Sequence, residues 1–233
     1  MSPRMTRPSR PTPPPDSTDD HVIPVQPSTP DGVVAAIANL IQSSNGRVRV
    51  MVDGASASEP ERLGAEVVKA LAPRRGVLIR ANHFWRQASL RFEDGRRDAD
   101  AWLDHWLDDG ALRREVLDAF ILTGRVLPAL RDPGTDRSLR QPHIDLPADG
   151  VVVVAGSVLL GRGLPFDLAI HVHLSSAALK RRTPEAQSWT LPALARYQSE
   201  RNPTTLADLV IRADDPLRPA LVARPPRTCT LLS

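Results

Sequence analysis

The sequence has little cysteine, little lysine and few aromatic residues. The one cysteine, Cys229, excludes a disulfide within the chain and any zinc site built from several cysteines. Lys69 and Lys180 are the only lysines, so arginine supplies almost all the basic residues behind a net charge of +3. No concentrated basic stripe of the kind that coats a phosphate backbone is present, so we expect no nucleic-acid partner.

Long apolar runs are also missing. The longest, at 151–155, is far too short to cross a bilayer, and no apolar signal-peptide core lies near the first residue. We therefore expect a cytoplasmic protein without a membrane partner. A hydrophobic content of 41% is nevertheless ample for a core, because a domain of about 200 residues buries roughly 70% of the surface of its unfolded chain.

The first thirty residues differ in composition from the rest. They contain nine prolines, and Arg4, Arg7 and Arg10 are balanced by three aspartates. Such a segment cannot bury enough apolar surface to offset the entropy of ordering, so we expect a disordered Pro/Arg-rich tail over 1–30. One folded domain is expected over 31–222, and a C-terminal tail over 223–233.

Strands and helices are predicted to alternate along the folded region. Asp31 is placed to cap a helix whose apolar face includes Val33, Ile37 and Ile41. Buried strands that alternate with helices predict an α/β fold, with a five-stranded parallel sheet covered by helices on both faces. The five predicted strands are the apolar segments 47–52, 77–79, 151–155, 168–174 and 207–212.

A phosphate-loop pattern follows the first of these strands, but the residues that would bind phosphate and magnesium are replaced. A strand, a glycine-led loop and a helix start make up the P-loop motif G-x-x-x-x-G-K-[ST], and Asp53 and Gly54 supply the strand end and the first glycine. Glu59 stands at the second glycine, Pro60 at the lysine and Glu61 at the hydroxyl residue. Pro60 has no N–H to offer a phosphate. A Gly-Lys-Thr sequence of charge +1 is replaced by one of charge −2.

The same residues also predict an ordinary helix start. Ser58 and Glu61 match the capping box S-x-x-E, with Pro60 inside the first turn. Because a helix N-terminus attracts anions, one hypothesis is that the carboxylates of Glu59 and Glu61 take the electrostatic role of a phosphate. The alternative is a capped helix that never bound phosphate, and spacing alone does not separate the two.

Together with later segments, this pattern resembles the uridine kinase family of P-loop nucleoside kinases over about residues 33–222. The similarity is to the branch with V-D-G-x-x-x-x-G-K-T, D-D-F-H-R, a Y/F-D-x-D-A-L-like segment, V-D-G-V-F-L-L and R-A-D-x-V-I-x-N-x-D-P. The matching segments lie at 52–61, 82–86, 107–112, 154–160 and 206–216. The resemblance implies the P-loop kinase arrangement of the parallel sheet, in a divergent relative with degraded catalytic motifs.

The resemblance also implies roles for single positions. Asn82 stands where the family has the aspartate that takes the proton of the nucleoside 5′-hydroxyl, and an amide cannot do so at neutral pH. Ala155 replaces the family's acid after the third strand. We therefore assign no catalytic residue at either position. Asp108 matches the ribose-holding aspartate and is a candidate for substrate binding.

Basic residues complete the candidate site. His83 and Arg86 adjoin Asn82 and are candidates to contact substrate, with His83 as an alternative base. Arg181 and Arg182 match basic residues of the family's lid, although a solvated helix face is the alternative for exposed arginines.

A histidine pair, His171-x-His173, places two imidazoles on one side of a predicted strand. Metal sites use such pairs, but no third ligand is evident. We therefore favour hydrogen-bonded sheet histidines and predict no metal site.

Three hypotheses for function remain. The sequence lacks the P-loop lysine, its hydroxyl, the base and the second acid, which removes four contributions to phosphoryl transfer. We favour an inactive pseudokinase that binds a nucleoside or an unknown protein partner, with no assigned cofactor. The alternatives are an active uridine kinase with an altered site for ATP and magnesium, and a scaffold with a closed cleft. A retained nucleoside pocket predicts open space near Asp108 and Arg86, whereas a scaffold predicts that Trp85, Trp102 or Phe92 fills it. An altered enzyme predicts a cation-binding pair of carboxylates that faces the cleft.

Overall fold

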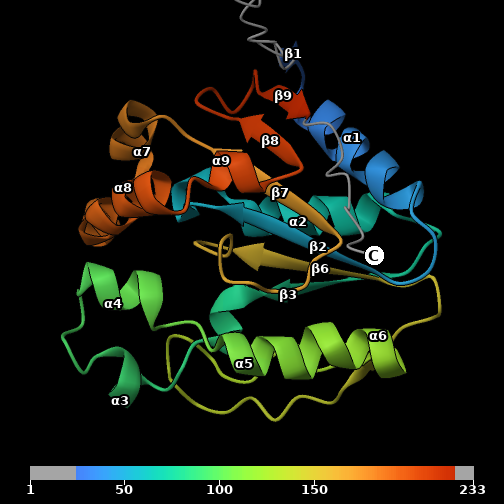
Figure 1. Ribbon diagram of the computed structural model, residues 1–233, viewed down its shortest axis with the longest axis horizontal. Coiled ribbons are helices and arrows are strands. Elements are labelled where there is room, and N and C mark those ends of the chain that lie inside the picture. Colours follow the sequence, from blue (N-terminus) through green and yellow to red (C-terminus); the bar gives the residue numbers. More distant parts are fainter. Residues whose placement is uncertain (1–24, 224–233) are drawn as a thin grey trace, which may run out of the picture.

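A computed structural model describes residues 25–223 of the chain (Figure 1). Within this range one mixed sheet has the strand order β1-β9-β8-β7-β2-β6-β3. Its strands are β1 (Val25–Pro27), β2 (Val48–Gly54), β3 (Gly76–Arg80), β6 (Val151–Gly156), β7 (Leu168–His173), β8 (Leu209–Arg212) and β9 (Ala220–Ala223). A separate antiparallel pair joins β4 (Arg125–Val126) to β5 (Ile144–Asp145).

The five predicted strands form the parallel part of the main sheet. β2 lies between β6 and β7, β3 pairs with β6, and β8 pairs with β7, all in parallel. Every residue of β6 is buried, which is typical of a strand with helices on both faces. The predicted α/β fold with a five-stranded parallel sheet is confirmed. β9 and β1 extend it by antiparallel pairing that the sequence pattern did not indicate.

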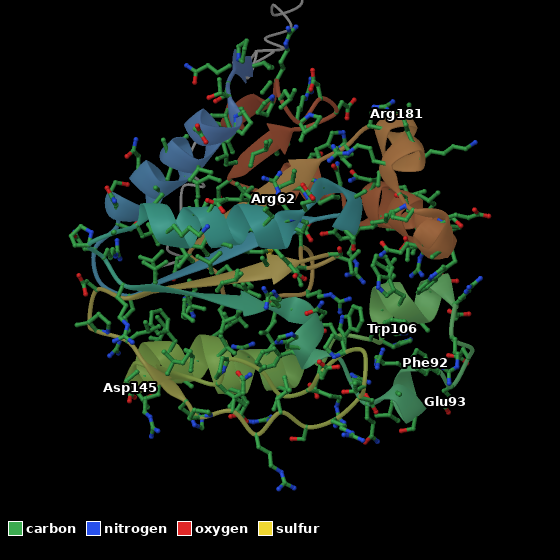
Figure 2. All side chains as sticks on the ribbon, turned by 180° about the vertical axis from the view of Figure 1, so that it is seen from behind. Arg62, Phe92, Glu93, Trp106, Asp145 and Arg181 are labelled. Carbon is green, nitrogen blue, oxygen red and sulfur yellow. The ribbon has the colours of Figure 1, made fainter. Side chains whose placement is uncertain are left out.

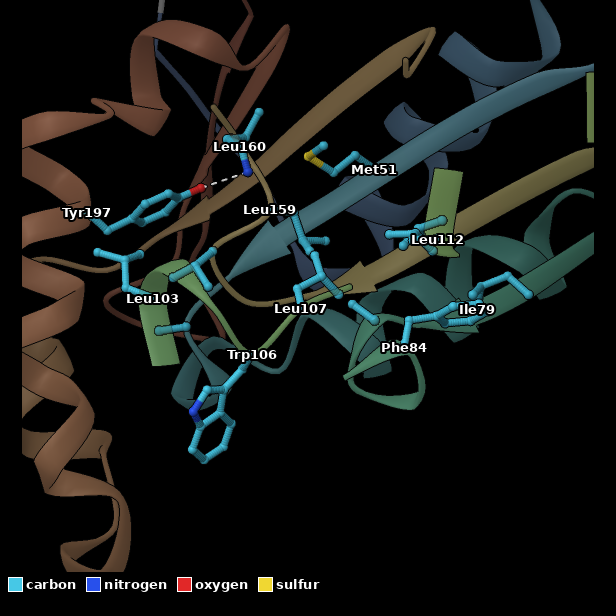
Figure 3. Packing of buried hydrophobic residues seen from close by; sticks show 14 of the residues in the cluster. Met51, Ile79, Phe84, Leu103, Trp106, Leu107, Leu112, Leu159, Leu160 and Tyr197 are labelled. Atoms are coloured by element: carbon cyan, nitrogen blue, oxygen red, sulfur yellow. Dashed lines mark hydrogen bonds between the residues drawn. The ribbon is translucent and has the colours of Figure 1, made fainter. Parts of the chain in front are cut away.

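Helices cover both faces of the sheet (Figure 1). On one face, α1 (Pro30–Gln42) and α2 (Pro60–Ala70) pack against alternate strand side chains such as Val50, Val153 and Ile170. The other face carries a second apolar cluster, in which Met51 of β2 and Leu112 of α5 take part (Figure 3).

The remaining helical elements lie in the connections between strands. Those before β4 are η1 (Ser56–Ser58), η2 (Ala81–Phe84), α3 (Ala88–Arg91), α4 (Ala99–Asp104), α5 (Asp109–Leu112), the π-helical turn η3 (Arg113–Asp118) and α6 (Ala119–Thr123). Those after β7 are α7 (Ser176–Arg182), η4 (Glu185–Thr190), α8 (Leu191–Glu200) and α9 (Pro203–Leu206). None of the helices in the described range is long and apolar enough to span a membrane.

Two boundaries differ from the sequence prediction. α1 begins at Pro30 with Thr29 as its N-cap, and the Thr29 hydroxyl accepts a hydrogen bond from the Gly32 N–H at 3.1 Å. The predicted cap at Asp31 was therefore wrong. The folded part also begins before residue 31, because β1 pairs with β9 at the sheet edge, where a proline is tolerated. The last described residue, 223, belongs to β9, and the rest of both predicted tails, 1–24 and 224–233, lies outside the described residues.

Candidate functional site

Three connecting segments meet at the carboxyl ends of adjacent strands, where open α/β sheets bind their ligands. Residues 55–59 follow β2, η2 follows β3, and residues 157–160 follow β6. Together they border one cavity of about 470 Å³. The part of its lining that comes from these segments and from the start of α2 is Ser56, Glu59, Pro60, Glu61, Arg62, Ala81, Asn82, Gly156, Ser157 and Val158.

The loop after β2 contains a left-handed residue at the position that a P-loop gives to glycine. Glu59 has φ 55° and ψ 50°, a backbone conformation that costs a residue with a Cβ roughly 1–2 kcal/mol. Position 54, at the start of the loop, requires a glycine because neighbouring atoms lie too close to leave room for a side chain. A Cβ there would lie 2.5 Å from Ser58 Oγ and 3.0 Å from the Val172 carbonyl oxygen. The loop therefore has a glycine at position 54, where a side chain would clash, and a strained backbone at Glu59, where a P-loop has its second glycine.

The predicted capping box at the start of α2 does not form. The Ser58 hydroxyl donates to the Ala55 carbonyl at 2.7 Å, and Glu59, the N-cap residue, makes no side-chain cap hydrogen bond. The prediction was wrong because a capping box needs an extended N-cap backbone, whereas Glu59 is left-handed.

The two carboxylates of this loop pair with arginines. Glu59 lies 2.9 Å from Arg62, and Glu61 lies 3.2 Å from Arg80. Burial raises the pKa of Glu61, and the charge of Arg80 only partly offsets this. Within the described residues, both carboxylates contact guanidinium groups and not backbone N–H groups of the loop. These contacts give no support to the hypothesis that Glu59 and Glu61 stand in for a phosphate.

Asp53, near the end of β2, lies at the centre of a buried hydrogen-bond network. Its Oδ2 accepts from the Tyr197 hydroxyl at 2.9 Å and lies 2.7 Å from His171 Nδ1, and its Oδ1 accepts from the Leu159 N–H at 2.8 Å. The Tyr197 oxygen accepts from the Leu160 N–H at 2.9 Å (Figure 3). Burial beside the Asp53 carboxylate raises the pKa of Tyr197, so this hydroxyl stays protonated. The network ties α8, β7 and the segment after β6 to the base of the phosphate loop.

The two histidines of β7 have different surroundings. His171 is hydrogen-bonded in the sheet, as predicted, and is only 2% exposed. His173 has a buried Nδ1 without a hydrogen-bond partner in the described structure, and burial lowers its pKa. Over residues 25–223 no group of three or more His, Cys, Asp or Glu side chains is arranged to hold a metal ion.

All four tryptophans of the chain line the cavity. The ring centroids of Trp106 lie 5.1 Å from those of Trp85 and 5.6 Å from those of Trp189, and Trp102 lies 6.2 Å from Trp189. Trp102 and Trp106 are both buried. Together with Trp85 and Trp189 they form one wall of the cavity, and we call these four rings the aromatic wall. No sequence pattern predicts this wall, because Trp189 belongs to η4, far along the chain from the other three tryptophans.

A buried arginine backs the aromatic wall. The Arg91 guanidinium lies 5.4 Å, 4.7 Å and 5.1 Å from the ring centroids of Trp85, Phe92 and Trp106, and Figure 2 shows Phe92 beside Trp106. Arg91 is 3% exposed and pairs with Asp136 at 3.4 Å. The electron-rich faces of the rings stabilise this desolvated cation.

The structure places only some of the residues that the family resemblance singled out in the lining of the cavity. Asn82 lines the cavity, and its buried Oδ1 has no partner among the described residues. Ala155 is fully buried in β6. The side chains of His83, Arg86 and Asp108 are not part of the lining. Asp108 instead caps α5, because its Oδ1 accepts an N–H of the first turn at 2.8 Å.

The two predicted lid arginines lie on α7, outside the lining of this cavity. Arg182 donates to the Ala213 carbonyl at 2.8 Å and borders a second cavity of about 380 Å³ beside α1 and α2. Arg181 is exposed, away from Trp106 (Figure 2). The segment after α7 that does border the cavity is η4, through Gln187, Trp189 and Thr190.

Arg162 is the other arginine of the described lining, and its guanidinium is fully engaged. It donates to Asp109 at 3.0 Å, to the Val158 carbonyl at 2.7 Å and to the Leu103 carbonyl. Its side chain is 4% exposed. This cation therefore stabilises the local structure and has little capacity left for a ligand.

Comparison with known proteins shows the fold. No protein-family model matches the chain, and no curated protein matches it. It is similar to the structure of a possible uridine kinase from Bacillus stearothermophilus, with a TM-score of 0.63 and 16% identity over 76% of this chain and 96% of that one. A putative fructose transport system kinase from Silicibacter sp. TM1040 gives a TM-score of 0.54 and 18% identity, with 73% and 90% covered. Phosphoribulokinase from Rhodobacter spheroides gives 0.52 and 14%, with 80% and 83% covered.

Proposed function

We propose that this chain, which has the fold of the P-loop kinases, is a uridine kinase-like protein that binds a small ligand without transferring phosphate from ATP. The observation that carries the proposal is the sequence Glu59-Pro60-Glu61 at the start of α2, where a phosphate cradle needs Gly-Lys-Thr. A pseudokinase of this kind acts through the occupancy of its cleft.

The charges around the loop oppose a triphosphate. Glu59 and Glu61 line the cavity, and both arginines of the described lining, Arg62 and Arg162, are already bound to carboxylates. At an effective dielectric constant of 20, a carboxylate repels a phosphate charge about 5 Å away by an upper limit of about 3 kcal/mol, because Arg62 and Arg80 partly neutralise Glu59 and Glu61. That energy corresponds to a loss of affinity on the order of a hundredfold.

The chemistry of transfer is missing as well. Pro60 replaces the lysine that would reach the phosphates, and Glu61 replaces the hydroxyl that would bind magnesium. Asn82 lines the cavity but cannot accept a proton from a substrate hydroxyl. Ala155 offers no carboxylate. Because phosphoryl transfer depends on positioning and charge stabilisation, the loss of these groups together removes the catalytic machinery.

Two alternative functions have less support. An active kinase with an altered site predicts a cation-binding pair of carboxylates at the cleft. Glu59 and Glu61 line the cavity, but over residues 25–223 no group of three or more His, Cys, Asp or Glu side chains is arranged to hold a metal ion, and His83, the alternative base, is not part of the lining. A scaffold would need a filled cleft, whereas about 470 Å³ remains open between the tryptophans and the loop. That volume lies within the range of roughly 300–1,000 Å³ typical of small-molecule sites.

A phosphotransfer assay tests the proposal. We expect no release of ADP above background when the wild-type chain is incubated with Mg·ATP and uridine. In the triple variant Glu59→Gly, Pro60→Lys, Glu61→Thr, binding of Mg·ATP should appear in calorimetry while transfer stays absent, because Asn82 and Ala155 are unchanged. The control Glu59→Gln, Glu61→Gln removes the negative charge but keeps the proline, so its gain in binding should be smaller. Turnover by the wild-type chain would contradict the proposal.

A further inference from the structure

The cavity combines an aromatic wall with unused hydrogen-bond acceptors. Trp102, Trp106 and Trp189 lie in the lining of this cavity of about 470 Å³, and so do Glu61 and Asn82. The tryptophans offer aromatic rings, and Glu61 and Asn82 offer oxygen atoms. A ligand that satisfies both must present an apolar or planar body together with hydrogen-bond donors.

The aromatic wall suits a cation. Indole is the ring that attracts cations most strongly, by about 0.5–1 kcal/mol when exposed and about 2 kcal/mol or more when desolvated. The wall already holds one desolvated cation on its far side, because the Arg91 guanidinium lies within 5.4 Å of the ring centroids of Trp85 and Trp106. The cavity side carries further rings of the same kind, and the described part of the chain places no cation against them there.

Two acceptors of the lining, Asn82 and Glu61, have hydrogen-bonding capacity left. Asn82 Oδ1 is buried and has no partner among residues 25–223, and the Glu61 carboxylate pairs with Arg80, which is not part of the lining. The two arginines of the described lining are already paired, Arg62 with Glu59 and Arg162 with Asp109. One donor is also left over, the buried Trp106 Nε1–H, which an acceptor on the body of the ligand can satisfy.

We infer that the ligand of this cavity is a small organic cation, an ammonium or guanidinium ion with an apolar or planar body. The inference rests on the proposed function, since a cleft that bound ATP would hold an anion instead. The positive nitrogen lies near Glu61 and Asn82, and the body packs against the tryptophans. The same two substitutions that repel phosphate, at positions 59 and 61, then serve recognition of a positive charge.

Three probes of matched shape and different charge test this inference on the full chain. Phenethylammonium is the cation, 2-phenylethanol the neutral analogue and 3-phenylpropanoate the anion. Because all four tryptophans line the cavity, titration followed by intrinsic tryptophan fluorescence reports occupancy directly. We expect the cation to bind at least about tenfold more tightly than the alcohol, because only the cation gains a cation–π contact and a charge pair. The anion should bind most weakly.

Two variants separate the charge from the shape of the site. Glu61→Gln should weaken binding of the cation about tenfold and leave the alcohol unchanged, because it removes charge and keeps volume. Glu66→Gln is the matched control, since Glu66 lies on the same helix, pairs with Lys69 and borders the second cavity only. Equal affinities for the three probes, a preference for the anion, no fluorescence change with any probe, or equal effects of the two variants would each overturn the inference. A failure of the proposed function would appear separately, as phosphate transfer from ATP.

Discussion

Replacement of Tyr197 by phenylalanine removes one buried oxygen from the network beneath the phosphate loop. That oxygen donates to Asp53 Oδ2 and accepts from the Leu160 N–H, both at 2.9 Å. Tyr197 is 2% exposed, so water has no access to the groups that lose their partner. The ring is unchanged in the variant, and the effect on stability therefore comes from the hydrogen bonds alone.

The expected magnitude follows from these two bonds. A hydrogen bond to a charged group contributes about 1.5–3 kcal/mol, and a buried N–H left unpaired costs about 1–3 kcal/mol. The two terms share one oxygen and one network, so they do not add in full. We expect the free energy of unfolding to fall by about 3 kcal/mol.

Urea denaturation followed by circular dichroism measures this loss. Ser199→Ala on the same helix is the control, because the Ser199 hydroxyl donates to the Arg196 carbonyl on an exposed turn, at 3.1 Å. The control should change the free energy of unfolding by no more than about 0.5 kcal/mol. A loss below about 1 kcal/mol for Tyr197→Phe would refute the reasoning that this network anchors the loop.

Three further substitutions test other parts of the site. Gly54→Ala should lower the free energy of unfolding in urea by about 2 kcal/mol, since its Cβ would lie 2.5 Å from Ser58 Oγ; an unchanged midpoint would contradict this. Glu59→Gly should cost less than about 1 kcal/mol in the same assay, because relief of the left-handed strain offsets the added freedom of the unfolded chain; a loss above about 2 kcal/mol would argue against strain there. Burial lowers the folded-state pKa of His173, so the unfolded chain binds this proton first and stability falls as the pH drops below 6.5. His173→Gln should flatten that decline in melting temperature, whereas Gln at the exposed His105 should not.

The sheet could be predicted because each of its parallel strands is a short local run of mostly apolar residues. Apolar segments such as 151–155 are buried on both faces, and their alternation with helices determines a parallel arrangement. β1 and β9 were not predicted, because three or four residues with a proline carry no periodic signal, and their pairing depends on contacts between the two ends of the domain. The cap of α1 was misplaced by two residues for a similar reason, since Thr29 and Asp31 are both suitable N-caps and only the chain path decides between them.

The candidate site was predictable only where a motif fixes a position. Glu59 and Asn82 were located through the spacing of the phosphate loop and of the segment after the second predicted strand, and both line the cavity. The left-handed backbone of Glu59 was missed, because nothing in its side chain favours that conformation. The partnership of Asp53 with Tyr197 spans 144 positions, and the aromatic wall joins Trp85, the nearby pair Trp102 and Trp106, and Trp189 from three separate parts of the chain. Such contacts are set by tertiary packing, which local sequence does not encode.

Titration calorimetry of the purified wild-type chain with Mg·ATP tests the central claim most directly. The account predicts no heat of binding up to millimolar nucleotide, because the Glu-Pro-Glu loop repels the phosphates and the lining arginines of the described structure are already paired. Binding with a dissociation constant in the micromolar range would contradict it, since the loop would then hold a triphosphate despite two carboxylates and a missing N–H.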